Sequence, residues 1–328
     1  MTLPDPASPL SEAAARDAFA AILDGSGAEQ DIAAFLTGLA DRGETATEIA
    51  AAATEMRARM IGVDAPENAI DVCGTGGDGS HSLNISTATS LVVAACDIPM
   101  AKHGNRAASS KAGAADTLEA LGLDLAKAAS KAEHNLREIG IGFFFAPNHH
   151  PALGPLAPIR KSIGRRTIFN LLGPLCNPAR VRRQLIGVAS PDLVETYADA
   201  ALQLGYDKAM IVSGEEGLDE LSISGPSRVA MISDGAVTIS RITPEDAGLT
   251  RHSAEAIKGG DPAYNAAALK ALLLGEKSAY RDAVLLNSAA ALMVAGEVDS
   301  WEAGVEEAAE ILDKGLAHAL LGCWIANQ

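Results

Sequence analysis

The chain has 328 residues, with 42 aspartates and glutamates against 26 lysines and arginines and a formal net charge of −16. This length suits about two domains and is enough to bury a sizeable core. The acidic balance argues against a nucleic-acid-binding protein or one that binds anionic membranes, because such proteins carry a basic surface. Any phosphate site in this chain therefore has to be local.

The four cysteines, Cys73, Cys96, Cys176 and Cys323, lie far apart and form no C-x-x-C pair. This spacing predicts the free thiols of a cytosolic protein, and we expect no structural metal on them. The N-terminal sequence lacks the basic and apolar regions of a secretory signal, and no apolar run approaches about 18 residues. We therefore expect a soluble, cytoplasmic protein without a membrane segment.

The N-terminal part of the chain has the apolar periodicity of helices and no strand pattern. Thr45 and Glu48 match a capping box, which predicts the start of one helix, and Gly25 and Gly43 are expected to end two others. The apolar residues occupy more than one face, and a small helical domain seldom buries so many alone; they include Phe19, Ile22, Leu23, Ile32, Phe35, Leu36, Leu39, Ile49, Ala53, Met56 and Met60. We predict a small helical domain over 1–67 that forms a homodimer.

From about Ala69 onwards, short apolar runs alternate with helical patterns. The predicted strands lie in "AIDVC", "IPMAKH", "IGFFFA", "QLIGVAS", "KAMIVSG" and "RVAMISDG". After the fourth of these, Ser190 is expected to cap a helix that has Pro191 at its first position. The alternation predicts a large α/β domain over 68–328 with a central, largely parallel sheet.

The stretch "DVCGTGGDGSHSLNIST" begins at Asp71 and combines a buried strand, a glycine-rich loop and the start of a helix. Gly74, Gly76 and Gly77 allow backbone N–H groups to approach an anion, and the helix N-terminus adds its unpaired N–H groups. The spacing matches neither the nucleoside triphosphate loop nor the dinucleotide motif. The pattern favours a phosphate site, and a plain glycine-rich turn before a capped helix is the alternative.

A second loop, "KHGNRAASSKAG", follows the next predicted strand and begins at Lys102. It places three cations beside an amide and two hydroxyls, and charged donors make the stronger hydrogen bonds to phosphate oxygens. Because both loops leave the carboxyl ends of strands, we expect them on the same edge of the sheet, where open α/β sheets bind ligands. A solvated basic loop is the alternative.

Together, "GTGGD", "NIST", "KHGNRAASSKAG", "RTIFNLLGPLCNP" and "GLDELS" resemble the anthranilate phosphoribosyltransferase family of tryptophan biosynthesis over nearly the whole chain. The resemblance implies the fold of the type III nucleoside phosphorylase group, with a small α domain, a large α/β domain and an active site in the cleft between them. It also implies that part of 160–180 joins the small domain.

The reaction implied by the resemblance is displacement of pyrophosphate from phosphoribosyl pyrophosphate (PRPP) by the amine of anthranilate, with magnesium, expected as two ions. The implied PRPP contacts are Gly74, Gly77, Asp78, Ser82, Asn84, Ile85, Ser86, Thr87, Lys102, His103, Gly104, Asn105, Arg106, Ala107, Ala108, Ser109, Ser110 and Ala114. The implied magnesium ligands are Ser86, Asp219 and Glu220, and the implied anthranilate contacts are Gly74, Asn105 and Arg160.

Several of these assignments have alternatives. On sequence alone, Asp219 and Glu220 could be surface acids, and His103 could be a loop donor instead of a proton carrier. Arg166 is close enough to Arg160 to be mistaken for the anthranilate arginine, and either could form a structural salt bridge. His149 and His150, in "NHHP", are interpreted as structural or substrate-channel residues. Ala114 stands where the family commonly has a serine, which puts one PRPP contact in doubt.

Three other functions fit the sequence less well. A pyrimidine nucleoside phosphorylase would share the fold, but its phosphate loop does not fit. A nucleic-acid-binding relative would carry a basic face, which the charge of −16 opposes. A helical dimerisation protein would explain residues 1–67 and nothing after them.

Overall fold

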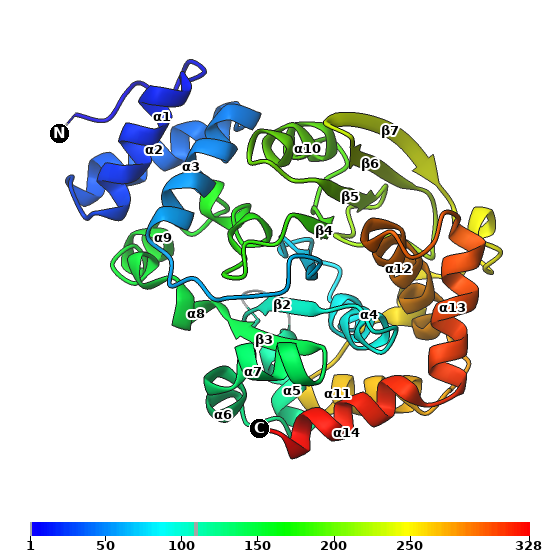
Figure 1. The fold of residues 1–328 in the computed structure, drawn as a ribbon. Coiled ribbons are helices and arrows are strands. Elements are labelled where there is room, and N and C mark those ends of the chain that lie inside the picture. The colour runs from blue at the N-terminus through cyan, green and yellow to red at the C-terminus, as the bar shows by residue number, and fades with distance from the viewer. Residues whose placement is uncertain (1, 108–110) are drawn as a thin grey trace.

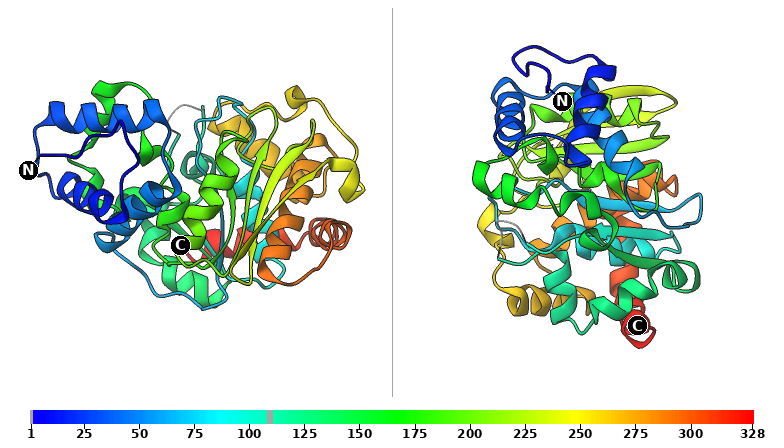
Figure 2. Two further views of the ribbon diagram at one scale, coloured as in Figure 1. Left: turned by 90° about the horizontal axis from the view of Figure 1, so that it is seen from above. Right: turned by 90° about the vertical axis from the view of Figure 1, so that its left-hand side faces the viewer.

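The computed structural model describes residues 2–107 and 111–328. Its N-terminal helices are α1 (Glu12–Leu23), α2 (Glu29–Arg42) and α3 (Ala46–Ala58). The predicted capping box is confirmed: Thr45 Oγ1 accepts from the Glu48 N–H, and the Glu48 carboxylate accepts from the Thr45 N–H. These helices form a small lobe at one end of the molecule (Figures 1 and 2).

A later segment covers the apolar faces of this lobe. Helix α9 (Ala157–Ile163) contacts α2, and the short 3-10 helices η2 (Ile168–Asn170) and η3 (Pro174–Cys176) contact α3. As a result, the residues that suggested a dimer are buried within one chain, namely Leu36, Leu39, Ile49 and Met56. The argument for a homodimer from unburied apolar faces is therefore wrong, because α9, η2 and η3 cover those faces.

A seven-stranded sheet in the order β3-β2-β1-β4-β5-β6-β7 forms the centre of the large lobe. The first five strands in this order are parallel, and the last two are antiparallel. This confirms the predicted fold class. The strands are β1 (Ile70–Gly74), β2 (Met100–Gly104), β3 (Ile141–Phe145), β4 (Arg183–Gly187), β5 (Lys208–Gly214), β6 (Ser227–Ser233) and β7 (Ala236–Ile242), the last of which was not predicted.

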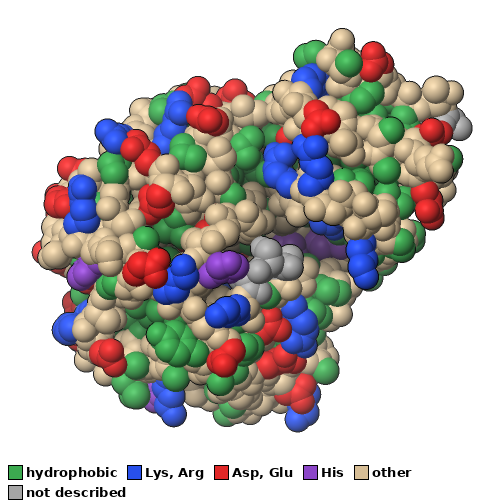
Figure 3. Space-filling model, turned by 180° about the vertical axis from the view of Figure 1, so that it is seen from behind, with side chains coloured by type: hydrophobic (Ala, Val, Ile, Leu, Met, Phe, Trp, Pro, Cys, Tyr) green, Lys and Arg blue, Asp and Glu red, His purple; other side chains and the backbone are tan. Residues whose placement is uncertain are grey.

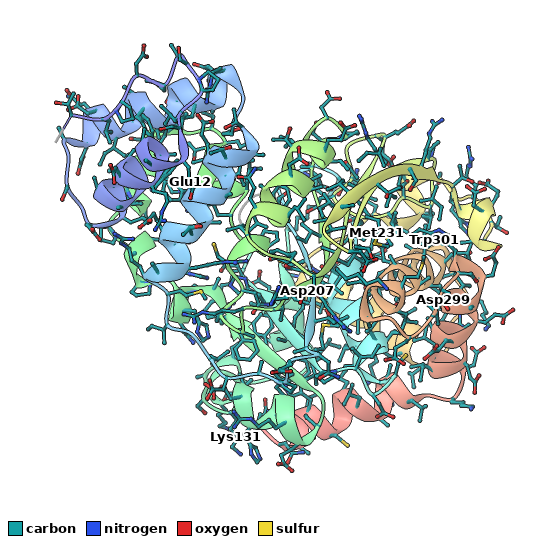
Figure 4. All side chains as sticks on the ribbon, turned by 45° about the horizontal axis from the view of Figure 1, so that its top comes forward. Glu12, Lys131, Asp207, Met231, Asp299 and Trp301 are labelled. Atoms are coloured by element: carbon teal, nitrogen blue, oxygen red, sulfur yellow. The ribbon has the colours of Figure 1, made fainter. Side chains whose placement is uncertain are left out.

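Both faces of the sheet are buried, because successive side chains along a strand belong to two different core clusters. Leu185 and Met210 belong to one core cluster, whereas their neighbours Ile186 and Ile211 belong to the other. The first cluster is covered by α4, α12, α13 and α14, and the second by α10 and the helical lobe. Met231 of β6 and Trp301 of α13, labelled in Figure 4, pack against the first cluster, while Glu12 marks the lobe on the other side.

The remaining helices are α4 (Ile85–Ala94), α5 (Ala114–Ala120), α6 (Leu125–Ser130), α7 (Ala132–Glu138), α8 (Ala146–His149), α10 (Leu193–Gln203), α11 (Pro262–Leu273), α12 (Ala279–Ala295), α13 (Trp301–Asp313) and α14 (Leu316–Ala326), with 3-10 helices η1 (Pro151–Leu153), η4 (Pro244–Ala247) and η5 (Ala254–Ile257). Helix α10 begins at Leu193 with Asp192 as its N-cap, so the predicted start at Pro191 is wrong. A turn from Ser190 to Leu193 precedes it, closed by a hydrogen bond from the Leu193 N–H to the Ser190 carbonyl at 3.0 Å.

Among the described residues, no helix combines the length and apolarity needed to cross a membrane.

Candidate active site

The carboxyl ends of β1 and β4 meet at two paired glycines, Gly74 and Gly187. From β1 the chain continues to β2 and β3 on one side of the sheet, whereas β4 and β5 lie on the other. Such a switch in strand order opens a crevice at the carboxyl ends, where open α/β sheets bind ligands. The loop after β1 starts here, with the Thr75 N–H donating to the Gly187 carbonyl at 2.9 Å.

Asp219 lies directly on these two glycines. A Cβ added to Gly187 would be 1.6 Å from the Asp219 carbonyl oxygen, and one added to Gly74 would be 2.2 Å from Asp219 Oδ2. Oδ2 also accepts from the Gly76 N–H at 2.7 Å. The glycines are therefore required by the close approach of "GLDELS" to "GTGGD", a reason that the sequence pattern did not reveal.

The acidic pair is not on the open surface, so the interpretation of Asp219 and Glu220 as surface acids is wrong. Glu220 is buried, and Glu220 Oε1 accepts from the Ser86 N–H at 3.1 Å in the first turn of α4. Burial and then the charge of Asp78 raise the pKa of Asp219 to about 7. Burial and then the charge of Asp219 raise the pKa of Glu220 to about 8. The site concentrates negative charge that a cation would balance.

A second observation also fits a divalent ion here. Asp78 Oδ2 is buried and has no hydrogen-bond donor among the described residues. Over residues 2–107 and 111–328, no group of three or more histidine, cysteine, aspartate or glutamate side chains is placed to hold a metal ion. A buried carboxylate oxygen without a donor suits magnesium, which keeps several waters and takes oxygens from one or two carboxylates and from substrate phosphates.

Lys102 is placed differently from an exposed loop cation. It is buried in the middle of β2, and its ammonium donates to the carbonyls of Val72 at 2.6 Å and His103 at 3.1 Å. Its charge lowers the pKa of Glu220, opposing the effect of burial. Lys102 is therefore fixed inside the sheet by backbone carbonyls, and its charge reaches Glu220.

His103 is also buried, and protein atoms engage both of its ring nitrogens. Nδ1 is 3.1 Å from the Gly173 carbonyl oxygen, and Nε2 is 3.3 Å from Nε2 of His150. A carbonyl can only accept, so Nδ1 carries the hydrogen and Nε2 accepts from His150. Burial, followed by the charge of His150, lowers the pKa of His103 well below its usual range. This geometry favours a structural role over proton transfer.

The loop after β2 closes on Asp116 of α5. Asp116 Oδ2 accepts from the N–H groups of Ala107 at 3.0 Å and Gly113 at 2.9 Å. The exposed Arg106 guanidinium bonds to Asp116 and Glu119, at 2.9 and 2.5 Å. Three of the predicted PRPP contacts, Ala108, Ser109 and Ser110, lie outside the described residues.

Other predicted contacts surround this loop. Gly104 packs against Phe143, because a Cβ added to Gly104 would lie only 2.7 Å from that ring and 3.3 Å from the Cβ of Ala114. Asn105 is exposed, and its Oδ1 accepts from the Arg106 N–H. At the start of α4, the side chains of Ile85 and Thr87 are buried, so only their backbone could reach a ligand. Ser82 bridges to Lys258, in a segment that sequence reasoning did not connect to the site.

The two candidate arginines have different surroundings. Arg166 forms an ion pair with Glu44, whose side chain is 1% exposed. The guanidinium of Arg160, on α9, has no ion pair or hydrogen bond with any described residue, and its carbon lies 5.9 Å from the centre of the Phe169 ring. Burial lowers the pKa of Arg160. A half-buried cation without an acidic partner is suited to the carboxylate of a ligand.

Figure 3 shows a hollow between the smaller lobe and the body of the molecule, with histidine and basic side chains at its edge. A separate cavity of about 590 Å³ lies elsewhere, between the 61–63 linker and α7, and of the predicted residues it includes only His149. Asp219 and Glu220 thus meet the loop after β1 and the start of α4 at the carboxyl edge of the sheet, whereas Arg160 lies on α9.

Comparisons with known proteins agree with this architecture. Residues 66–318 match the glycosyl transferase family α/β domain, and residues 7–60 match the helical bundle domain of the same family. The anthranilate phosphoribosyltransferase of Novosphingobium aromaticivorans is 64% identical over 99% of this chain and 98% of that protein. The chain belongs to the anthranilate phosphoribosyltransferase family.

Solved structures of the anthranilate phosphoribosyltransferase family support the same assignment. The Thermus thermophilus enzyme superposes with a TM-score of 0.93 at 41% identity, covering 99% of both chains. The Saccharomyces cerevisiae enzyme, solved in complex with PRPP and Mg, has a TM-score of 0.88 at 29% identity, covering 97% of this chain and 93% of that one. The same yeast enzyme has been solved with 4-fluoroanthranilate.

Proposed function

We propose that this chain transfers the phosphoribosyl group of PRPP to the amine of anthranilate, giving N-(5-phosphoribosyl)anthranilate and pyrophosphate in tryptophan biosynthesis. It would be a magnesium-dependent pentosyltransferase. The main structural support is the half-buried Asp219 and the buried Glu220, which meet the glycine loop of β1 and the N-terminus of α4 at one edge of the sheet. A polyanionic substrate with a divalent ion suits such an edge.

Asp219, Glu220 and Ser86 are the proposed magnesium ligands. Their oxygens suit a hard cation, and the charge crowding at Asp78 and Asp219 favours one. When bound, magnesium would balance the charge that develops on the departing pyrophosphate. Two ions are proposed, in keeping with the family resemblance.

The PRPP phosphates are proposed to lie against the loops after β1 and β2. The N–H group of Gly77 and the dipole at the N-terminus of α4 would attract anionic oxygens, and the buried charge of Lys102 would add to their effect. The remaining predicted contacts, Gly74, Asp78, Ser82, Asn84, Gly104, Asn105, Arg106, Ala107 and Ala114, border these loops.

Anthranilate is proposed to lie in the hollow between the lobes, with its carboxylate on Arg160 and its ring near Gly74 and Asn105. The amine lone pair would form the bond to C1 of the ribose as the bond to the pyrophosphate oxygen breaks and its electron pair leaves with pyrophosphate. The new ammonium then loses a proton to solvent. An arylamine is neutral near pH 7, so the chain's main contribution is to orient the two substrates and stabilise charge.

The remaining proposals concern organisation. The chain is proposed to divide into a helical domain over 1–67, joined by part of 160–180, and an α/β domain over 68–328; the packing of α9 on α2 supports this. The four cysteines are free thiols, which suits a cytoplasmic location. A homodimer through the helical domain rests on the family resemblance alone.

The decisive experiment is the loss of anthranilate fluorescence when PRPP and magnesium are added to the purified protein. Product formation that depends on all three components would support the proposal. Pyrimidine nucleoside with orthophosphate is the control, and turnover of that pair without turnover of PRPP would overturn the assignment in favour of a phosphorylase.

A further inference from the structure

The segment 257–260, which runs from the last residue of η5 toward α11, lies directly against the loop that follows β1. The Leu83 N–H donates to the Ile257 carbonyl at 2.8 Å, and the Gly259 N–H donates to the His81 carbonyl at 2.7 Å. A Cβ on Gly259 would lie 2.7 Å from the Ser82 carbonyl oxygen, so only glycine fits this approach. Part of the proposed PRPP loop is therefore held by residues far away in the sequence.

Asn265 in the first turns of α11 connects this segment to the start of α4. Its side chain is almost completely buried, at 2% exposure. Oδ1 accepts from the Gly260 N–H at 2.8 Å, and Nδ2 donates to Oδ1 of Asn84 at 2.9 Å. A backbone N–H can only donate, so the Asn265 oxygen must face Gly260 and its amino group must face Asn84.

This orientation determines the orientation of the Asn84 amide in turn. Asn84 Oδ1 accepts from Asn265 and also from the Thr117 hydroxyl at 2.6 Å. The amino group of Asn84 is then on the opposite side, 3.3 Å from the Ala112 carbonyl oxygen. An amide nitrogen carries two hydrogens, so one remains for a ligand after Ala112 has accepted the other.

We propose that Asn265 is a positioning residue for PRPP, which acts by fixing the Asn84 side chain with its N–H donors, and not its carbonyl oxygen, toward the anionic substrate. Without the Asn265 amino group, Asn84 Oδ1 loses one of its two donors, and only the Thr117 hydroxyl and the 3.3 Å bond to the Ala112 carbonyl oppose a turn of the amide that would present an acceptor to an oxygen-rich ligand. This inference rests on the proposed function, because it requires PRPP to bind beside Asn84.

The isosteric variant Asn265→Asp tests the proposal. Its carboxylate keeps an acceptor for the Gly260 N–H but faces Asn84 Oδ1 with a second oxygen, so the Asn84 amide is repelled from its position and loses its fixed orientation. We expect the Michaelis constant (KM) for PRPP to rise about tenfold or more, and the KM for anthranilate to change by less than about twofold. Calorimetric binding of PRPP with magnesium should weaken in parallel.

A double-mutant cycle covers the case in which Asn265→Asp fails to fold. Asn265→Ala should weaken PRPP binding in the wild-type background and have no further effect in the Asn84→Ala background, because its action passes through Asn84. Tyr280→Phe is the matched control, since it removes a 3.0 Å hydrogen bond to the Asn84 backbone carbonyl without touching the amide. It should lower the melting temperature and leave the ratio of the two KM values unchanged.

Two outcomes would overturn the inference while the wild type remains active: equal effects of the Asn265 variants on both substrates, or a PRPP effect of Asn265→Ala that persists in the Asn84→Ala background. A wild-type protein that does not convert PRPP and anthranilate would instead overturn the proposed function itself.

Discussion

Arg166 bonds to the buried carboxylate of Glu44 at two points, with Nη1 3.2 Å from Oε1 and Nη2 2.8 Å from Oε2. This joins the segment after α9 to the turn between α2 and α3. The guanidinium of Arg160, on α9 itself, has no such partner among the described residues. The two arginines, which sequence spacing could not separate, therefore have different expected functions.

Arg160→Ala should raise the KM for anthranilate by about ten- to a hundredfold, because a charge-assisted bond to a carboxylate contributes roughly 1.5–3 kcal/mol. The KM for PRPP should change little. Steady-state kinetics with each substrate varied in turn measures this. Aniline, which has no carboxylate, should lose much less than anthranilate in the variant.

Arg166→Ala is the matched comparison. It leaves the Glu44 carboxylate buried without its cation, and we expect a loss of about 1–3 kcal/mol of unfolding free energy, reduced because Arg166 is half-exposed. Both substrates should be affected equally and modestly. A selective anthranilate defect in Arg166→Ala, with none in Arg160→Ala, would show that the pocket is wrongly placed.

Replacing both Asp219 and Glu220 by Ala should reduce turnover by more than about a hundredfold, because bound magnesium contributes several kcal/mol to stabilising the transition state. The variant should still fold, since burial opposes ionisation of both carboxylates and their removal takes away that cost. A magnesium titration of activity, with PRPP-dependent thermal shift as a second readout, measures the effect. Activity within about twofold of wild type at every magnesium concentration would contradict the metal assignment.

Gly187→Ala should destabilise the protein by about 1–3 kcal/mol or more and abolish most activity, because the new Cβ would displace the Asp219 backbone. Urea unfolding and the fluorescence assay measure the two effects. The control is Gly322→Ala in α14, where a Cβ meets no atom within 4 Å. That change should be neutral or stabilising by up to about 1 kcal/mol.

The His103 and His150 pair predicts a loss of stability in acid. Burial, followed by the charge of His149, lowers the pKa of His150 to about 4, whereas the unfolded value is about 6.5. Below about pH 6.5 the unfolded chain therefore binds a proton that the folded chain does not, so this stability is present above that pH and lost as the pH falls toward 4.

The variant His150→Gln isolates this effect. The unfolding free energy of wild type minus that of His150→Gln should decrease by on the order of 3 kcal/mol between pH 7 and pH 4. Urea unfolding curves across this range measure it. A difference that stays constant with pH would mean that His150 accepts a proton as easily in the folded protein as in the unfolded chain.

A mass measurement in solution tests the proposed homodimer. Light scattering at micromolar protein should give twice the chain mass of 33.6 kDa. Because α9, η2 and η3 already cover the apolar faces of the lobe, its dimer surface would be more polar than the sequence suggested. A monomer mass independent of concentration would contradict the dimer.

Local signals in the sequence predicted six strands, the Thr45 capping box and the loops after β1 and β2, because these depend on residues close together in the chain. The seventh strand was missed although its signal was present. Asp234 and Gly235 have φ values of 52° and 74°, as expected for the Asp-Gly turn of a β-hairpin, and "SDG" precedes β7. The Asp-Gly dipeptide is therefore a local signal that predicts the hairpin and its second strand, β7.

Other features of the site could not be read from local patterns. The fit of Asp219 onto Gly187, the pairing of Arg166 with Glu44 and the bond between Asn265 and Asn84 all join residues distant in sequence. Lys102 looked like an exposed loop cation, because its neighbours are polar, but the β2 strand carries it into the interior. Such pairings depend on how the sheet and lobes pack.

The helical lobe shares its core with segments that the ribosome synthesises later, which affects how the nascent chain folds. Phe35, Leu36 and Met56 emerge from the ribosome long before Phe169, Leu175 and Tyr206, which belong to the same cluster. At roughly 5–20 residues per second, the lobe waits on the order of ten seconds for the segments that cover it. During that interval its apolar faces are open to chaperones or to other nascent chains. Conditions that slow translation between these segments should therefore increase aggregation of the nascent chain before they change the activity of the folded enzyme.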